Sequence, residues 1–480
     1  MTEPQKSPAP SQSGLGARLK SMTSSEFLRN VLTLMTGTTL AQVVIFATTP
    51  IITRLGVTTE MWGIYNGAFM AVAGFLIPVA ALRYDMAIVL PRNDDDARQL
   101  FRLSTALNTG ISLLAAAAMV LWGDELAAWL ITPHEGQQYF AEQVAPWLPM
   151  VGLIIWGYAQ VNIVNYWSNR RKQYKVTSTN TMVNSLTTAG GRMFVAWAAL
   201  GPIGLVVATL LGQAAALTNF FIRSGKDVLR APGKSRSTME LIRAYSKMPL
   251  LNAPNALVDA IRISGIPATL SHFFGAGTTG AFNMAWTLVQ TPMNLINAAL
   301  SQVFFQKLSV TPRGRMYRAI RMSIVRSLAI GILPFALIWA LGPWFMPIFL
   351  GEEWRGAGVV AAILVPWLYI NFVTSPVSTV FVVARRQGLA LFFATIYMVT
   401  PLAIIWTTHD DLNATLKLVS WSMAVLLCCY LGLALYVAKA YDNGFGAEHD
   451  AKQTGETTAA VAEEQVEQTS EIPGDQVGQS

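Results

Sequence analysis

The stretch "MPLLNAPNALVDAIRISGIPATLS" (residues 248–271) decides the class of fold. It is long enough to cross a bilayer as a helix, which takes about 20 mostly apolar residues. Asp259 and Arg262 are its only ionisable residues and lie one helical turn apart. A charge at the centre of a membrane helix costs about 2.5–3.5 kcal/mol on insertion scales. Two charges here therefore indicate either a mutual ion pair or a polar site.

The whole chain has the composition of a membrane protein. Of its 480 residues, 53% are hydrophobic and 13% are charged, and the mean hydropathy is +0.42. Soluble domains average about 25% charged residues. Cys428 and Cys429 are adjacent in an apolar run, so they form no disulfide framework and we expect both to be buried. The composition predicts an all-α, polytopic membrane protein.

Apolar stretches along the chain predict twelve transmembrane helices, an even number that places both termini on the same side. Most of the 34 Lys and Arg residues lie in alternate connections. Because cytoplasmic connections are enriched in Lys and Arg, both termini are expected in the cytoplasm. The same placement argues against a nucleic-acid role for the net charge of +7. The predicted spans are 30–53, 61–82, 100–121, 147–167, 176–199, 203–223, 248–271, 279–304, 322–345, 357–383, 388–407 and 413–438.

The longest inner connection follows the sixth span and predicts two halves of six helices. "APWL" (145–148) opens the fourth span and "VPWL" (365–368) opens the tenth, as an internal repeat would. Transporters with repeated halves often bind substrate between them. The expected organisation is a disordered cytoplasmic N-terminus (1–25), an N-terminal lobe (26–223), a cytoplasmic linker (224–246), a C-terminal lobe (247–440) and a disordered acidic cytoplasmic tail (441–480).

Polar side chains follow one face of several predicted spans. Such stripes indicate either hydrogen bonds between helices or a shared water-accessible cavity, and charges among them favour the cavity. Arg192 follows Asn184 and Thr188 at four-residue steps and has no acid in its own span, so an anion or another helix must satisfy it. The cavity candidates are Arg262, Asp259, Arg192, Asn255, Asn252, Gln290, Asn294, Asn297 and Gln42.

No pattern typical of an enzyme site is present in the sequence. Neither a cluster with metal-ligand spacing nor a Walker-type phosphate loop occurs, so we expect no catalytic residues, no metal and no cofactor. The run "DDDAR" (94–98) is better explained as the start of an inner-face helix, because acidic residues stabilise a helix N-terminus. These observations favour transport over catalysis.

Two segments resemble a known family. "PIITRLGVTTEMWG" (50–63), followed by "LRYDMAIVLPRNDDDA" (82–97), resembles the N-terminal signature of polysaccharide-biosynthesis flippases. These O-antigen-type oligosaccharide flippases belong to the multidrug/oligosaccharidyl-lipid/polysaccharide exporter superfamily. "GAFNMAWTLVQTPMNLINAALSQVFFQKLS" (280–309) is similar to a later pattern of the family. The departures are Gly56 for the usual aromatic residue, Thr59 for the usual Pro, and Phe282 where Tyr is common.

The resemblance implies a bacterial inner-membrane flippase with two six-helix lobes around a central cavity. Its cargo would be a polyprenyl-diphosphate-linked oligosaccharide, moved to the periplasmic leaflet for O-antigen of lipopolysaccharide, capsule or exopolysaccharide. Alternating access, coupling to H⁺ or Na⁺, and polysaccharide polymerase or assembly proteins as partners are also implied. Arg262 and Arg192 would contact the diphosphate, since guanidinium suits phosphate geometry. Asp259 would hold Arg262 or carry a proton, and Arg54, Arg83 and Asp85 would act as gate or structural residues.

Two other classes of protein stay open. A MATE-like exporter of cationic drugs predicts an acid-dominated cavity, whereas the interior candidates here include two Arg and one Asp. A membrane polysaccharide polymerase predicts a large outer loop with catalytic Arg or His. The longest outer loop (122–146) holds one His and no Arg.

Overall fold

The computed structural model describes residues 26–134, 137–231, 233, 235–309, 314–384 and 386–444. The predicted disordered segments, 1–25 and nearly all of 441–480, lie outside these ranges. Within them the regular structure is helical throughout, which confirms the all-α class. The elements are α2 (Glu26–Arg54), α3 (Thr59–Ile64), η1 (Tyr65–Met70), α4 (Ala71–Leu76), η2 (Ile77–Val79), α5 (Tyr84–Ala87), α6 (Asp94–Leu130), α7 (Ala141–Val144), η3 (Ala145–Trp147), α8 (Met150–Arg170), α9 (Tyr174–Trp197), α10 (Gly201–Val228), α11 (Thr238–Ala244), α12 (Lys247–Ser309), α13 (Met316–Leu350), η4 (Glu352–Trp354), α14 (Arg355–Val377), α15 (Val380–Val383), α16 (Gln387–Thr407) and α17 (Leu412–Asp442).

The helices follow the predicted spans. Two of these, 248–271 and 279–304, share α12, which is broken at Gly275 with φ +80° and ψ 168°. Glycine adopts this conformation because it has no Cβ. Among the described residues, seven helices are long and apolar enough to cross a membrane, or eight if α7–η3 and α8, bent by 50°, form one span. The multi-pass class is confirmed, and the count of twelve stays a prediction.

The contacts of the chain divide it into two compact units. The first contains the described residues up to 295, together with 334–368 and 394–423. The second contains the described residues of 296–333 and 369–393 and those from 424 to 444. One end each of α13, α14, α16 and α17 therefore belongs with the N-terminal helices, while the opposite end of each belongs to the second unit. The division into lobes at 224–246 stays a prediction.

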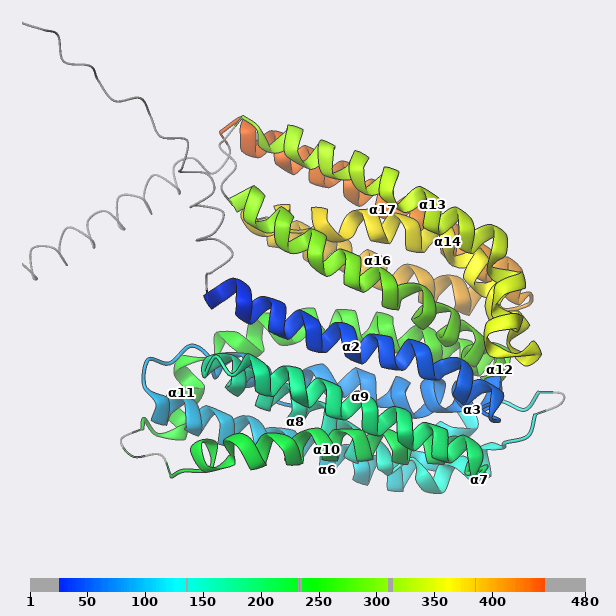
Figure 1. Ribbon diagram of the computed structural model, residues 1–480, viewed down its shortest axis with the longest axis horizontal. Helices are drawn as coiled ribbons and strands as arrows, with labels where there is room; N and C mark the ends of the chain where they lie inside the picture. Colours follow the sequence, from blue (N-terminus) through cyan, green and yellow to red (C-terminus); the bar gives the residue numbers. More distant parts are fainter. Residues whose placement is uncertain are drawn as a thin grey trace, which may run out of the picture. The chain divides into compact units, whose positions relative to one another are not determined.

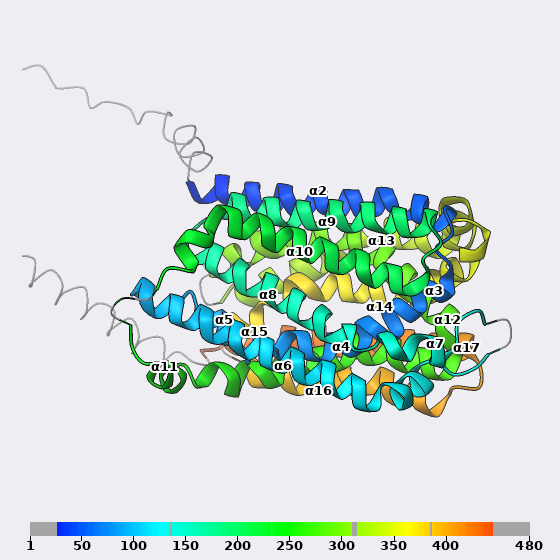
Figure 2. The ribbon, with the colours of Figure 1, turned by 90° about the horizontal axis from the view of Figure 1, so that it is seen from below.

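Five long helices of the first unit pack side by side. The helix α9 lies against both α2 and α10, and α8 lies against both α10 and α6 (Figures 1 and 2). Their apolar core includes Phe101 on α6, Trp167 on α8 and Phe220 on α10, all buried. Phe101 meets Trp167 edge to face with ring centroids 5.9 Å apart. Such pairs contribute about 0.5–1.5 kcal/mol beyond the burial of their area.

An ion-pair network ties together the ends of α6, α8 and α10. α6 begins at Asp94, as the sequence predicted for the "DDDAR" run, and Asn93 caps it by accepting from the Asp95 N–H. Asp94 pairs with both Arg170 and Arg171 at 2.8 and 2.7 Å. Further pairs join Asp95 to Arg98, Asp96 to Arg236, and Asp227 to both Arg98 and Arg171. The acidic run is therefore a brace in which every carboxylate has a guanidinium partner.

Within the brace, charge pairing outweighs burial in its effect on the pKa of Arg171. Hydrogen bonding to the Asp227 carboxylate, reinforced by Asp94, raises the pKa of the Arg171 guanidinium above its usual value. The guanidinium also lies over the Trp167 ring, 5.5 Å from its centroid. Networks with several partners per charge hold their geometry better than isolated surface pairs. The brace thus fixes this end of the first unit.

The helix α3 approaches α12 so closely that only glycine fits. A Cβ on Gly63 would lie 1.6 Å from the carbonyl oxygen of Ala276, and one on Gly280 would lie 1.8 Å from that of Thr59. Real Cβ atoms do not come this close to another atom. Both partners are backbone carbonyl oxygens, which cannot move aside as the end of a flexible side chain can. The two backbones therefore touch, and we name this region the glycine seam (Gly63 and Gly280 with Ala276 and Thr59).

In the second unit, the end of α17 caps the start of α13. The Asp442 carboxylate accepts hydrogen bonds from the N–H groups of Gly314, Met316 and Tyr317 at 2.8 to 3.0 Å. These donors have no partner inside the helix, and a negative charge at a helix N-terminus is stabilising.

One prediction about α17 is wrong: Cys428 and Cys429 are exposed on this helix rather than buried. An apolar run in a membrane helix can face lipid as well as core, so hydrophobicity alone did not decide their burial.

Candidate substrate site

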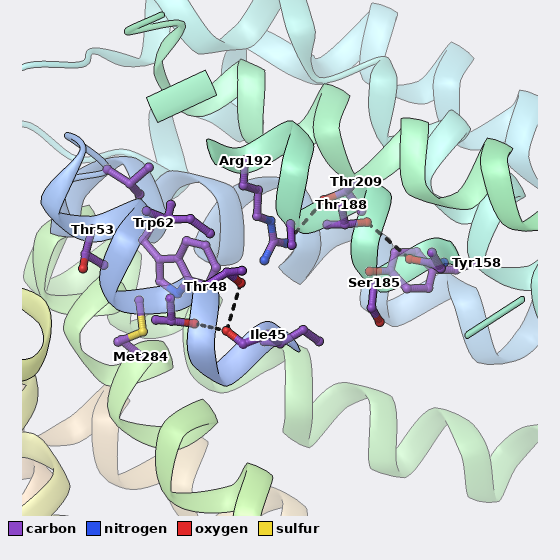
Figure 3. A pocket seen from close by; sticks show the side chains of 15 residues that line it. Ile45, Thr48, Thr53, Trp62, Tyr158, Ser185, Thr188, Arg192, Thr209 and Met284 are labelled. Carbon is purple, nitrogen blue, oxygen red and sulfur yellow. Dashed lines mark hydrogen bonds between the residues drawn. The ribbon is translucent and has the colours of Figure 1, made fainter. Parts of the chain in front are cut away.

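A cavity of about 130 Å³ lies inside the first unit, between helices that the sequence separates widely (Figure 3). It is bordered by α2, α3, α8, α9, α10 and α12. Its lining residues are Ile45, Thr48, Thr49, Ile52, Thr53, Val57, Trp62, Tyr158, Asn184, Ser185, Thr188, Ala189, Arg192, Thr209 and Met284. We name it the Arg192 cavity, because Arg192 is the one charged side chain among these described residues.

Arg192 is held in place by hydroxyl groups and aromatic rings. Its guanidinium donates to the Tyr65 hydroxyl at 3.1 Å and to Thr209 Oγ1 at 3.4 Å. It lies 4.9 Å from the centroid of the Trp62 ring and 5.2 Å from that of Tyr65. Cation–π contacts of this kind contribute about 0.5–2 kcal/mol, depending on desolvation. Among the described residues, the side chain is therefore held by uncharged groups.

The charge of Arg192 is not neutralised within the part of the chain that the structure describes. No ion pair there includes Arg192, and its buried Nε–H has no hydrogen-bond partner. A buried, unmatched donor costs about 1–3 kcal/mol, more when it is charged. Both deficits would be removed by an anion that entered the cavity. The electrostatics thus favour a negatively charged ligand.

Local structure explains how these groups meet. Asn184, Thr188 and Arg192 lie four residues apart on α9, so they share one helical face, as the sequence predicted. Gly212 on α10 permits the approach of Thr188, whose Oγ1 would lie 2.0 Å from a Cβ at that position. Tyr65 begins η1, a π-helix, a form of backbone common at functional sites. Its hydroxyl also bonds Thr209 Oγ1 at 2.9 Å.

The size and lining of the cavity limit what it holds. Sites for drug-sized ligands run from about 300 Å³ upward, so this cavity suits a small charged group rather than a whole oligosaccharide. Hydroxyls from Thr48, Thr188, Ser185 and Tyr158 line the same space as the guanidinium (Figure 3). Hydroxyl groups donate hydrogen bonds to anionic oxygens. The arrangement suits a phosphoryl group.

Arg262 lies in a different and smaller cavity, of about 80 Å³, with Asn283 and Trp286 among its lining. Its guanidinium is 3.7 Å from the Asp259 carboxylate and 5.0 Å from the centroid of the Tyr397 ring. The Asp259 side chain is 60% exposed and that of Arg262 is 17% exposed. At this distance and exposure the pair is a weak one. Arg262 is held mainly by its aromatic contact.

The remaining predicted cavity residues do not join Arg192. Asn255 is exposed, and the Asn252 amide donates to the Met248 sulfur at 3.4 Å. Gln42 and Gln290 are half-buried, and neither lines the Arg192 cavity. Asn297 is buried in the second unit. The side chain of Asn294 lies outside the described residues.

The predicted gate or structural residues flank the stretch from α3 to η2, with Arg54 before it and Arg83 and Asp85 after it. The Arg54 guanidinium donates to the Ile348 carbonyl. Arg83 has a left-handed backbone (φ +61°) and donates to the Pro78 carbonyl at 3.4 Å. Asp85 is buried, with 7% of its surface exposed. None of the three lines the Arg192 cavity, and their roles stay predictions.

Residues of the site that were not singled out from the sequence include Trp62, Tyr65, Tyr158 and Thr209. A signal existed for the first two, because residues three apart share a helical face, and Trp62 belongs to the segment 50–63 that resembles the flippase signature. Tyr158 and Thr209 carried no such signal. Their place depends on how α8 and α10 pack, which no local pattern specifies.

Residues 35–358 match the model of a protein family described as polysaccharide biosynthesis protein. The chain belongs to this family. The match begins within α2, ends near the start of α14 and includes every residue that lines the Arg192 cavity. A comparison with curated proteins gave no match.

Solved structures with the same fold are transporters of the multidrug/oligosaccharidyl-lipid/polysaccharide superfamily. An inward-facing multidrug resistance MATE transporter has a TM-score of 0.60 at 15% identity, covering 84% of this chain and 96% of its own. The lipid II flippase MurJ, inward closed, has a TM-score of 0.63 at 12% identity, covering 84% and 87%. A superfamily transporter from Pyrococcus furiosus, with a binding pocket of reverse polarity, has a TM-score of 0.56 at 14% identity, covering 87% and 96%. The chain has the fold of these membrane transporters.

Proposed function

We propose that this protein is a flippase for polyprenyl-diphosphate-linked oligosaccharide and that Arg192 binds the diphosphate. One observation carries the proposal: a partly buried cation among hydroxyl groups, with no acid among the described lining of its cavity. The planar guanidinium binds two phosphate oxygens at once, and its Nε–H is free to donate. Membership of a polysaccharide biosynthesis family supports a sugar-bearing cargo.

In this proposal the cavity binds only the charged group of the cargo. The Thr188 and Thr48 hydroxyls, which donate to Asn184 Oδ1 at 3.3 Å and to the Val44 carbonyl at 2.7 Å in this structure, would turn to donate to the diphosphate when it binds. Trp62 supplies an apolar face beside it. The sugars and the polyprenyl chain extend beyond the 130 Å³ of the cavity, with the lipid chain in the bilayer. In this proposal the protein lies in the inner membrane with both termini in the cytoplasm. It uses alternating access driven by H⁺ or Na⁺ and delivers its cargo to a polysaccharide polymerase.

A binding experiment tests the proposal directly. Purified protein in nanodiscs is titrated with farnesyl diphosphate, and with farnesol as the uncharged control. Arg192→Ala is expected to weaken binding of the diphosphate by about 10- to 100-fold, because a hydrogen-bonded charge contributes about 1.5–3 kcal/mol. Arg192→Lys should retain the charge but lose the bidentate geometry, and so fall between the two.

The outcome that contradicts the proposal is equal binding of the diphosphate by Arg192→Ala and the unmodified protein. Arg262→Ala is the matched comparison, since this Arg also lies on an aromatic ring but in another cavity. A deletion strain carrying each variant then reports export of surface polysaccharide. The sequence prediction that Arg262 also contacts cargo is tested by the same pair of measurements.

Export of cationic drugs, as by a MATE-type transporter, is the alternative that the fold permits. It requires a cavity that attracts cations, whereas the described lining of the Arg192 cavity carries a positive charge and no carboxylate. Drug resistance that survives in the Arg192→Ala strain, together with normal polysaccharide, would support the exporter instead.

A further inference from the structure

Four segments that are distant in sequence meet around a second, polar cavity of the first unit. The cavity has a volume of about 370 Å³ and includes the start of α3, the loop after α6, the break in α12 and η4. Its lining residues are Thr58, Thr59, Glu60, His134, Gln137, Gln138, Phe274, Gly275, Ala276, Gly277, Thr278 and Glu353. Two residues of the glycine seam, Thr59 and Ala276, are part of this lining.

Carboxylates at this cavity bind backbone N–H groups of other segments. Glu353 on η4 accepts from the Thr59 N–H at 2.8 Å and from the Thr59 hydroxyl at 3.3 Å. Glu60 on α3 accepts from the N–H groups of Gln138 and Tyr139, each at 2.9 Å. Hydrogen bonds to a charged acceptor are about twice as strong as neutral ones. These hydrogen bonds therefore join segments that are far apart in the sequence.

The Thr59 contact is specific because of its position in the helix. Thr59 is the first residue of α3, after the cap Thr58. The N–H groups at the start of a helix have no partner within it, so the Thr59 N–H is free to bind Glu353. The flippase pattern has Pro at this position, and Pro has no N–H. The link between Thr59 and Glu353 therefore exists in this chain because it departs from that pattern.

We propose that Glu353 is a latch that keeps this end of the transporter closed by holding Thr59. The proposal rests on the transport function, since cargo passes this end only when α3 and η4 separate. Release of the latch lets the glycine seam part. At Gly63 and Gly280 the seam brings backbone against backbone, so no side chain at these two positions has to move when it parts. The latch contact then sets the fraction of molecules in which this end is open.

Distances measured by electron paramagnetic resonance test the latch without any substrate. Spin labels are placed at Asp124→Cys on α6 and Asp410→Cys before α17, both exposed positions, after replacement of Cys428 and Cys429 by Ser. Thr59→Pro removes the N–H donor, and it suits the fold because Pro is favoured at the first position of a helix. Glu353→Ala removes the acceptor.

Each variant is expected to raise the ratio of the longer to the shorter distance population by about tenfold, the effect of losing one charge-assisted hydrogen bond. Glu352→Ala is the matched control: it removes the neighbouring carboxylate, which pairs with Arg355 and not with Thr59. Its distances should equal those of the labelled parent.

Unchanged distances in both Thr59→Pro and Glu353→Ala would overturn the latch, as would a change in Glu353→Ala alone. Thermal unfolding of each variant confirms that it is folded. If the latch result holds but Arg192→Ala binds farnesyl diphosphate normally, the assigned cargo fails while the latch stands.

Discussion

At the scale of single residues, the site depends on how one guanidinium is supported. The Tyr65 hydroxyl and Thr209 Oγ1 accept from Arg192, and they also bond each other at 2.9 Å. Trp62 and Tyr65 cover faces of the guanidinium. These neutral groups orient the charge without cancelling it. A carboxylate in their place would hold Arg192 equally well but would compete with an anionic ligand.

Replacing Tyr65 by Phe tests this support. The change removes one hydrogen bond to Arg192 and keeps the aromatic ring. We expect affinity for farnesyl diphosphate to fall about threefold to tenfold, because such a bond contributes about 0.5–1.5 kcal/mol. Calorimetric titration in nanodiscs measures the change.

Tyr369→Phe provides the control for that substitution. It removes a Tyr hydroxyl that donates to the Leu328 carbonyl at 2.8 Å in the second unit. Its affinity should match the unmodified protein. A Tyr65→Phe variant that binds as tightly as this control would show that the hydroxyl does not position Arg192.

At the scale of elements, glycines decide how closely helices approach. The seam between α3 and α12 has room for hydrogen only, whereas Gly110 on α6 has no atom within 4 Å of its would-be Cβ. The same residue type therefore has opposite effects at the two places. Gly63 permits close contact between two helices, whereas Gly110 only lowers the helix propensity of α6.

Paired substitutions measure this difference. Gly63→Ala places a Cβ against the Ala276 carbonyl and should destabilise the protein by about 1–3 kcal/mol, as overpacking does. Gly110→Ala should be neutral or stabilise it by up to about 1 kcal/mol. Thermal unfolding in detergent compares the two. Equal melting temperatures would mean that α3 and α12 do not touch at Gly63.

The sequence predicted elements better than the contacts between them. Hydropathy located the helices because apolar length is a local property, and the four-residue spacing placed Thr188 and Arg192 on one face. Asp259 and Arg262 were grouped with Arg192 as cavity residues, whereas Asp259 is exposed and Arg262 lines a separate cavity; their contact with cargo stays a prediction. Spacing specifies a face of a helix but not its neighbour. Only packing brings Tyr65 from α3–η1 to Arg192 on α9.

At the scale of the whole molecule, the two ends of the helices differ. Residues 334–368 and 394–423 belong with the N-terminal helices, whereas 296–333 and 369–393 form part of the other unit. The brace around Asp94 and Asp227 fixes one end of the N-terminal helices, and the latch and glycine seam lie at the Glu60 end. Movement between helices is therefore expected at the latch rather than at the brace.

Reporter fusions test the proposed membrane topology. Alkaline phosphatase fused after Phe140 should be active, because that loop is expected in the periplasm. Fluorescent protein fused after Ala244 and after Asn443 should fluoresce in the cytoplasm. If alkaline phosphatase fused at either of the last two positions were active, the prediction of twelve spans with cytoplasmic termini would be wrong.

The π-helix at Tyr65–Met70 makes the number of residues in this segment decide the direction in which the side chains on either side of it point. A π-turn accommodates an extra residue compared with an α-turn. Deleting one residue there would restore a regular helix and rotate the residues on one side by about 100° relative to the other, the angle per residue of an α-helix. Tyr65 would then turn away from Arg192, or the glycine seam would lose its register. An insertion or deletion in this short segment is therefore expected to disrupt the site by changing its register.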